Sequence, residues 1–408
     1  MAVIILKKRR KMQRKEEAKG MKVVVAIDSF KGSLSSIEAG NAVKNGILRC
    51  CPDAEVEICP LADGGEGTVE AFVNGMRGKF CHKKVTGPLG SEVEARYGII
   101  GENTAVIEMA EAAGLPLLKE DERNPLRTTT YGVGELIKDG IEKGCRRFFI
   151  GIGGSATNDG GVGMLQALGF GFLDEKGRQI PFGAGGLEKL FELTTDDVIP
   201  ELKECEFRIA CDVTNPLCGE NGCSAVFGPQ KGADEEMILK MDRWLAQYAS
   251  IASRKFKNAD ALRPGTGAAG GCGFAFAAFL DGVLEPGIKV VLELTGMERY
   301  IKDADVVITG EGRLDGQTVM GKAPVGVAAL AKKYGKPVIA FSGSVTEDAR
   351  KCNQHGIDAY FPILREICSL EDAMNLERAG KNMEDTVEQV FRLLSVSVKN
   401  NILPASDR

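Results

Sequence analysis

Residues 23–48 read VVVAIDSFKGSLSSIEAGNAVKNGIL. The apolar run 23–27 has the length of a buried strand, and the apolar spacing over residues 36–48 predicts a helix behind it. The same change from strand to helix recurs: strands are predicted at 56–61, 306–309, 338–342 and 359–362, and helices at 67–76, 324–334 and over 370–399. This alternation is typical of an α/β fold built on a parallel sheet.

The middle of the chain loses this alternation. β-like segments at 80–86, 92–100 and 104–109 are followed by further α/β pattern over 146–174 and by a glycine-dense stretch at 265–273. Because 408 residues exceed the size at which one hydrophobic core stops growing, we expect two domains. A Rossmann-like α/β domain with a parallel sheet is predicted over residues 21–84 and 285–399. A mixed α/β domain is predicted to be inserted over residues 85–284.

The charge of the chain is unevenly distributed. Residues 1–20 carry eight Lys or Arg against two Glu, and we interpret them as a disordered basic extension. The formal net charge is -5, so the rest of the chain is more acidic still, which argues against nonspecific binding of nucleic acid. The apolar stretch 2–6 is shorter than the core of a signal peptide and precedes the basic residues instead of following them.

The cysteines do not form a metal-binding pattern. None of the 12 Cys lies in a CxxC pair, and only two His are present, so a structural zinc is not expected. Many of the Cys stand in apolar surroundings, which fits a reducing compartment, and we expect a cytoplasmic protein. No stretch approaches 18 apolar residues, so no membrane partner is expected.

Three glycine-rich turns carry acidic residues: ADGGEGT at 62–68, GIGGSATNDGG at 151–161 and TGEGRLDGQTVMGK at 309–322. Glycine lets backbone amides approach an anion closely, and a helix that begins behind the turn adds positive potential. The acids would repel phosphate unless a cation lies between them, so the turns predict a metal-assisted phosphoryl-transfer site. With the first and third turns on one domain and the second on the other, we expect a substrate cleft between the domains that closes to exclude water.

Two other interpretations of these glycines compete. Gly151, Gly153 and Ala156 match a dinucleotide-binding fingerprint, and Asp174 lies near the acidic position that would bind the ribose, which would indicate an NAD(P)-dependent oxidoreductase. Against this, Asp159 would stand close to the pyrophosphate, and the first strand is followed by DSFKGS instead of the fingerprint. A non-catalytic protein that binds a sugar acid or phosphate is the third hypothesis, with the acids serving only as helix caps.

Five blocks carry a resemblance to a known family: AIDSFKGSLSS (26–36), PLADGGEGT (60–68), GIGGSATNDGG (151–161), CDVTNPLCG (211–219) and GEGRLDGQT (310–318). In this order they resemble the type-1 glycerate kinase family from residue 21 to about residue 399. The resemblance implies a kinase that uses ATP and Mg²⁺ to phosphorylate D-glycerate, at the 2-hydroxyl to give 2-phosphoglycerate. It also implies a small-molecule substrate; the acidic charge predicts no nucleic-acid partner, and the sequence leaves a homodimer open.

The demands of that reaction assign hypothetical roles to the residues of the turns. Two acids could accept the proton of the substrate hydroxyl, with Asp159 the first choice and Asp212 the second. Lys31 and Arg313 are the expected catalytic cations, and Arg313 could bind the glycerate carboxylate or the transferring phosphoryl group. The alternatives are a solvated loop lysine, an interdomain salt bridge and, for Asp212, an Asx-type turn.

Nucleotide and metal would be held by the same turns. The expected nucleotide-binding residues are Gly64, Gly65, Gly153, Gly154, Ser155, Thr157 and Lys322. Lys322 ends a GxxxxGK sequence that lacks the Ser or Thr of a P-loop, so we expect only a point-charge contact to phosphate. Because Mg²⁺ needs few carboxylates, one or two of Asp63, Glu311 and Asp315 are expected as ligands. Each of these acids could instead cap a helix.

Overall fold

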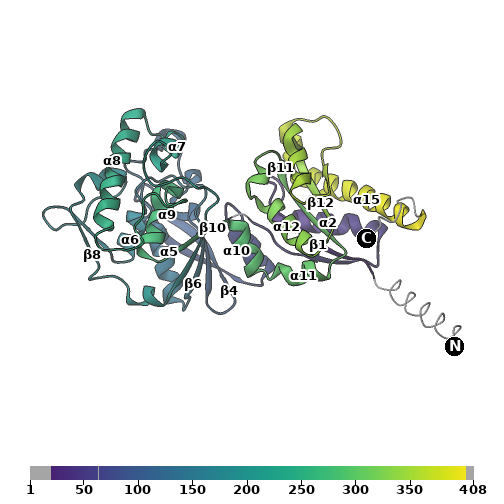
Figure 1. Cartoon of the computed structure of the whole chain (residues 1–408), viewed down its shortest axis with the longest axis horizontal. Helices are drawn as coiled ribbons and strands as arrows, with labels where there is room; N and C mark the ends of the chain where they lie inside the picture. The colour runs from purple at the N-terminus through teal and green to yellow at the C-terminus, as the bar shows by residue number, and fades with distance from the viewer. Residues whose placement is uncertain (1–19, 63, 401–408) are drawn as a thin grey trace. The chain divides into compact units, whose positions relative to one another are not determined.

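The chain forms two compact units, which we describe separately (Figure 1). The computed structural model describes residues 20–62 and 64–400. Of these described residues, unit 1 contains those up to Leu61 and again from Leu292, and unit 2 contains those within Ala62–Val291. The predicted boundaries at 84/85 and 284/285 lie inside unit 2, where they would cut strands β3 (Lys79–Thr86) and β10 (Val283–Glu285).

Unit 1 is built on a five-stranded sheet in the order β13-β12-β11-β1-β2, with every neighbouring pair parallel. Its strands are β1 (Lys22–Ile27), β2 (Glu55–Ile58), β11 (Val306–Leu314), β12 (Val338–Val345) and β13 (Ala359–Pro362). The predicted α/β class with a parallel sheet is therefore confirmed. β11 runs five residues further than the predicted strand end at Thr309, because Arg313 and Leu314 still pair with Ser344 and Val345 of β12. The third glycine-rich turn thus begins at Asp315.

Helices cover both faces of this sheet. Helix α2 (Ser36–Cys50) starts at a capping box in which Ser35 and Glu38 satisfy each other's backbone N–H groups. Its apolar face packs with α15 (Leu376–Asn400) on the side chains of Val23 and Val25. The alternate residues of β1 are buried as well, and α12 (Ala323–Lys333) contacts β1 and β11. The remaining helices after unit 2 are α11 (Met297–Asp303), α13 (Lys351–Gln354) and α14 (Leu370–Met374).

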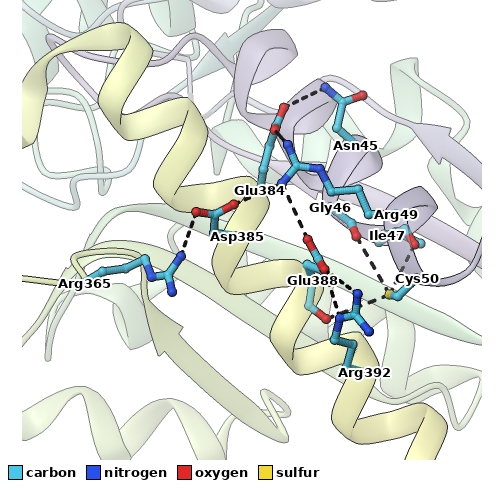
Figure 2. Close-up of polar contacts among 10 residues, drawn as sticks. All are labelled: Asn45, Gly46, Ile47, Arg49, Cys50, Arg365, Glu384, Asp385, Glu388 and Arg392. Atoms are coloured by element: carbon cyan, nitrogen blue, oxygen red, sulfur yellow. Dashed lines mark hydrogen bonds and ion pairs between the residues drawn. The ribbon is translucent and has the colours of Figure 1, made fainter.

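An ion-pair cluster aligns α15 on α2 (Figure 2). The Arg49 guanidinium pairs with Glu384, with Asp385 at 3.0 Å and with Glu388 at 3.6 Å. A methyl group on Gly46 would lie 2.5 Å from the carbonyl oxygen of Glu384, so the helices touch through the glycine backbone. Because the charged groups are partly exposed, they fix the register of the two helices more than they stabilise the fold.

Unit 2 contains a mixed six-stranded sheet in the order β10-β9-β6-β5-β4-β3. The remaining strands of this sheet are β4 (Glu92–Ile100), β5 (Thr104–Glu108), β6 (Arg147–Gly151) and β9 (Glu206–Ala210), and β7 (Gly171–Leu173) pairs with β8 (Glu192–Thr194). β3, β4 and β5 are antiparallel, whereas β5, β6, β9 and β10 run parallel. The C-terminal ends of the four parallel strands therefore meet at one edge.

The helices of unit 2 enclose an aromatic core that includes Phe172, Tyr248, Phe274 and Phe279. They are α3 (Thr68–Gly75), α4 (Ala110–Ala113), α5 (Tyr131–Glu142), α6 (Val162–Ala167), α7 (Cys223–Phe227), α8 (Glu235–Ala252), α9 (Ala268–Phe279) and α10 (Gly287–Leu294), the last of which runs into unit 1. A search of the helices in the described residues finds none with the length and apolarity needed to cross a membrane.

A buried carboxylate ties α5 to β3 and β4. Asp139 accepts a 2.7 Å hydrogen bond from the Tyr97 hydroxyl and forms ion pairs with Lys83, at 3.1 Å, and Lys143. Burial alone would raise the pKa of this carboxyl, but the hydrogen bonds from Lys143, Tyr97 and Lys83 outweigh it and lower the pKa below 3.8. The charged form therefore stabilises unit 2 above that pH.

We predict that Asp139→Asn lowers the free energy of unfolding of unit 2 by about 2 kcal/mol at pH 7, because the charge-assisted bonds are lost. The difference should shrink as the pH falls below about 3.8, because the carboxyl is protonated first in the unfolded chain and in the folded chain only at its lowered pKa. Fluorescence of Trp244, the single Trp of the chain, reports urea unfolding of this unit. Exposed Asp121→Asn is the control, and equal stability of Asp139→Asn and wild type at pH 7 would contradict the prediction.

Candidate active site

The first two glycine-rich turns meet at the C-terminal edge of the unit 2 sheet. A methyl group on Gly64 would lie 2.2 Å from Cβ of Ala210, and one on Gly151 would lie 2.0 Å from the carbonyl oxygen of Gly64. Gly153 likewise approaches Gly65, with 3.6 Å between its added methyl position and the Gly65 Cα. The sequence grouped the first turn with the third; the structure places it with the second, because the chain enters unit 2 at Ala62.

Only the tip of the second turn reaches solvent. Gly153 and Gly154 are exposed, whereas residues 155–161 are buried. Within the described residues, the N–H groups of Gly153 and Gly154 donate no hydrogen bond to another backbone group, so they can donate to an anion. Ser155 and Thr157, expected to bind nucleotide, are nearly or fully buried, which leaves the two glycines as the solvent-facing part of the turn.

Asp159 lies beneath this turn with both carboxylate oxygens engaged. One oxygen accepts hydrogen bonds from the N–H and hydroxyl of Thr130, both at 2.9 Å, and from the N–H of Gly163 at 3.2 Å; the other accepts from Gly161 at 3.0 Å. Burial raises the pKa of this carboxyl, and the hydrogen bonds oppose the rise. The carboxylate occupies the N-terminus of the six-residue helix α6, so that helix end is not open to phosphate.

Asp212 has a different setting. It follows β9, at the same sheet edge as the second turn, and is exposed to solvent. One carboxylate oxygen accepts a 3.1 Å hydrogen bond from the N–H of Gly287, the first residue of α10. Of the two acids expected as the base, Asp212 is the one that solvent and substrate can reach.

Two buried ionisable residues at this edge were missed by sequence reasoning. Glu108 ends β5 in register with Gly151 and accepts a 2.7 Å hydrogen bond from the N–H of Val69, in the first turn of α3. Its position near the end of the predicted strand 104–109 was the signal that could have found it. Lys231, in the short segment GPQKG, is buried below the second turn and carried no such signal, since a lysine in a polar loop normally faces water.

Burial raises the pKa of Glu108 to about 7, with Glu111 adding to the rise and the hydrogen bond from Val69 opposing it. The carboxyl binds its proton more tightly in the folded than in the unfolded chain, so unit 2 loses stability as the pH rises from about 4.5 to 7. A shift of this size corresponds to roughly 3 kcal/mol.

We therefore predict that Glu108→Gln, which does not titrate, gains about 3 kcal/mol relative to wild type between pH 4.5 and pH 7.5. Urea unfolding followed by Trp244 fluorescence at several pH values measures the change. Exposed Glu102→Gln serves as the matched control. Parallel pH dependences for Glu108→Gln and wild type would show that Glu108 does not titrate in this range.

In unit 1, the predicted acids and cations lie along the end of β11. Glu311 is buried, accepts a 2.7 Å hydrogen bond from the Thr318 hydroxyl and lies 3.6 Å from the ammonium of Lys322. Arg313 is largely exposed, and its Nε lies 3.6 Å from Asp315. The structure thus brings both expected metal ligands of this unit beside expected phosphate-binding cations.

The loop that carries Lys31 lies against the same strand. A methyl group on Gly312 would be 3.4 Å from Cα of Phe30 and 3.7 Å from the backbone nitrogen of Lys31. The Lys31 side chain is exposed. Next to this strand end is an open hollow of about 370 Å³ whose lining includes Arg313, Asp315, Gln317, Thr346, Asp348 and Lys351. Its charges are mixed, and Lys351 is a cation that the sequence had not singled out.

The described carboxylates do not form a ready-made metal cage. Within residues 20–62 and 64–400, no three His, Cys, Asp or Glu side chains cluster as metal ligands, and Asp63 lies outside the described residues. Mg²⁺ typically takes one or two carboxylates and completes its shell with water and substrate phosphates. Glu311 and Asp315 fit that requirement. Each has a carboxylate oxygen paired with a cationic side chain, and a phosphate that bound this cation would leave the oxygen available to a metal ion.

The residues of the dinucleotide fingerprint are used differently. Asp174 accepts hydrogen bonds from the N–H groups of Lys176 and Arg178 and pairs with the Arg178 side chain at 2.9 Å, so it closes a local turn. The approach of Gly64 to Gly151 fills the space behind the turn with backbone. This geometry gives no support to the oxidoreductase interpretation.

Comparison with known proteins decides the family. The model of the glycerate kinase family matches residues 23–395. The chain belongs to this family. It is 48% identical over 373 residues to a glycerate 2-kinase of Escherichia coli K12, covering 90% of this chain and 98% of that protein. A glycerate kinase of Bacillus subtilis 168 is 47% identical, with 91% and 97% covered.

The fold of the family is also known from a crystal structure. A protein from Salmonella typhimurium LT2, assigned as glycerate kinase 2, superposes with a TM-score of 0.86 at 46% identity, covering 93% of this chain and all of that one. The resemblance drawn from the five sequence blocks is thus confirmed, and the chain is an enzyme of the glycerate kinase family.

Proposed function

We propose that this enzyme phosphorylates D-glycerate with ATP and Mg²⁺, at the 2-hydroxyl, to give 2-phosphoglycerate. The observation that carries the proposal is the near full-length match to a glycerate 2-kinase at 48% identity. The exposed glycines of the second turn and the cation-acid pairs of β11 support the proposal, because such a reaction needs groups that can bind phosphate and a metal ion. The 12 cysteines are all free, which supports a reducing compartment such as the cytoplasm.

In unit 2, the exposed N–H groups of Gly153 and Gly154 would bind a phosphoryl group, and Gly64 and Gly65 would shape the backbone behind them. Asp212 would take the proton of the 2-hydroxyl while that oxygen forms its bond to the γ-phosphorus and the bond from the γ-phosphorus to ADP breaks. Asp159 would hold the turn in shape through its hydrogen bonds to Thr130, Gly161 and Gly163.

In unit 1, Arg313 and Lys31 are proposed to bind anionic groups of the substrates, and Lys322 to contact phosphate as a point charge. Glu311 and Asp315 would hold Mg²⁺, and Asp63 stays a predicted ligand that lies outside the described residues. When bound, the ion neutralises charge on the phosphates during transfer. Lys351 lines the same hollow as Arg313 and is a further candidate for anion binding.

The proposed function is tested by a coupled assay for ADP together with phosphorus NMR of the product. ATP consumption should require both D-glycerate and Mg²⁺, and the product should be 2-phosphoglycerate. L-Glycerate is the matched control substrate. Absence of D-glycerate-dependent turnover would refute the activity, and formation of 3-phosphoglycerate would refute the assignment of the hydroxyl.

The role of the base is tested by two amide substitutions with different expected outcomes. Asp212→Asn should lower kcat by about 10²- to 10⁴-fold with little change in Tm, because the side chain is exposed. Asp159→Asn should lower stability by about 1–3 kcal/mol, since its NH₂ group would face backbone donors. Steady-state kinetics and thermal unfolding measure both effects. Should Asp212→Asn keep full activity while Asp159→Asn loses kcat at unchanged Tm, the base is Asp159.

A further inference from the structure

Lys231 lies under the second glycine-rich turn and is 2% exposed. It follows α7, and its ammonium donates hydrogen bonds to the Ser155 hydroxyl at 2.9 Å and to the Thr157 carbonyl at 2.6 Å. Ser155 is the residue directly after Gly154, one of the two exposed glycines of the tip. One buried side chain therefore forms hydrogen bonds to two residues, Ser155 and Thr157, that follow the proposed phosphate-binding tip.

The shape of the turn depends on this contact and on close backbone packing below it. Gly270 has φ +64°, and a methyl group there would lie 2.0 Å from the carbonyl oxygen of Thr157, the same carbonyl that accepts from Lys231. A second side chain also bonds to this loop: the hydroxyl of Thr128 donates a 2.9 Å hydrogen bond to the carbonyl of Ala156. With these contacts the segment 155–158 has little freedom to move away from the ammonium.

The ammonium is buried without an ion pair to a carboxylate in the described part of the chain. The titratable groups that act on it are Cys223 of α7, Cys272 of α9 and, in the turn itself, Asp159; Tyr248 of α8 lies next to the last two. Burial raises the pKa of both thiols far enough to keep them neutral at pH 7. The carboxylate of Asp159 already accepts hydrogen bonds from the backbone N–H groups of Thr130 and Gly161. An isolated cation at such a depth is unfavourable unless an anion compensates it.

We propose that Lys231 is a positioning residue for the phosphorylated ligand: it fixes the Gly153–Thr157 segment and supplies a buried positive charge that a phosphate at the glycine tip compensates. The inference rests on the proposed function only in that this turn binds a phosphoryl group. Either a nucleotide or the phosphorylated product could bring that group, and the two sources are separated by testing each ligand.

The charge state of Lys231 gives the proposal a signature that a purely structural role lacks. Burial lowers the pKa of this ammonium to about 8 in the free protein. As the pH rises through that value the charge is lost, so phosphate affinity should weaken between pH 7 and pH 9. A bound phosphate favours the charged form and should shift this loss to higher pH.

The experiment measures the affinity of the full chain for ADP, 2-phosphoglycerate and inorganic phosphate by calorimetry at pH 7, 8 and 9. We expect wild-type affinity for at least one of these ligands to fall about tenfold over this range. Lys231→Met should bind that ligand about tenfold or more weakly at pH 7 and should lack the fall. Exposed Lys138→Met is the matched control and should behave as wild type.

Thermal unfolding checks that the variants are folded. A second variant, Lys231→Arg, tests the charge separately. Met fills most of the lysine volume and removes a buried charge, which offsets part of the cost of leaving the Thr157 carbonyl without its donor, so Lys231→Met should stay folded at the assay temperature. Lys231→Arg keeps the charge at all these pH values and should bind at pH 7 while lacking the fall. Two results would overturn the proposal: unchanged affinity in Lys231→Met, or a pH dependence in that variant equal to that of wild type.

This outcome is separate from that of the proposed function, because binding is measured without turnover. A wild-type protein that shows no D-glycerate-dependent ATP consumption would refute the kinase assignment. The binding measurements would still decide the role of Lys231. A protein with full kinase activity whose Lys231→Met variant keeps both affinity and pH dependence would refute only the role of Lys231.

Discussion

The candidate site of unit 2 depends on backbone-to-backbone contact at the ends of β6 and β9. Gly64, Gly151 and Ala210 are packed so closely that any larger side chain at the two glycines would collide with neighbouring main chain or Cβ atoms. Main chain therefore fills the space at the base of the second turn. Gly153 and Gly154, two and three residues beyond Gly151, are the exposed residues of this turn. A phosphate would then meet N–H groups rather than side chains, which suits a ligand carrying several negative charges.

The charges around the turn are arranged by depth. Asp159 is buried and saturated with hydrogen bonds, Glu108 is buried and has a pKa raised to about 7, and Asp212 remains exposed. Beneath them Lys231 offers the one buried ammonium that contacts the turn in the described residues. Burial therefore raises the pKa of both Asp159 and Glu108, whereas Asp212 at the same sheet edge stays in contact with solvent. The sequence shows which residues are acidic or basic, but it does not show how deeply each side chain is buried.

The elements with strong periodicity were predictable, and the long-range contacts were not. The predicted strands 92–100 and 359–362 match β4 and β13, because both have clear boundaries in glycine, proline or charged residues. The end of β11 was missed because pairing with β12, not local propensity, extends it through Arg313. The first glycine turn was grouped with the wrong partner turn since nothing in ADGGEGT reveals that the chain changes unit at Ala62. Lys231 was overlooked for the reason that a loop lysine is normally solvated.

The parallel sheet of unit 1 also bears on how the chain matures during synthesis. β1 pairs with β11, and the backbone N–H of Lys22 bonds to the carboxylate of Asp305, 283 positions later. Helix α2 completes its apolar contacts only with α15, at the far end of the chain. β1 can pair early with β2, but the ribosome must synthesise the chain through residue 314 before β11 is available on the other side of β1; the strands of unit 2 are contiguous in sequence and can assemble earlier. The nascent N-terminal segment, with its run of valines, is the part of this protein that most needs protection from aggregation while it waits.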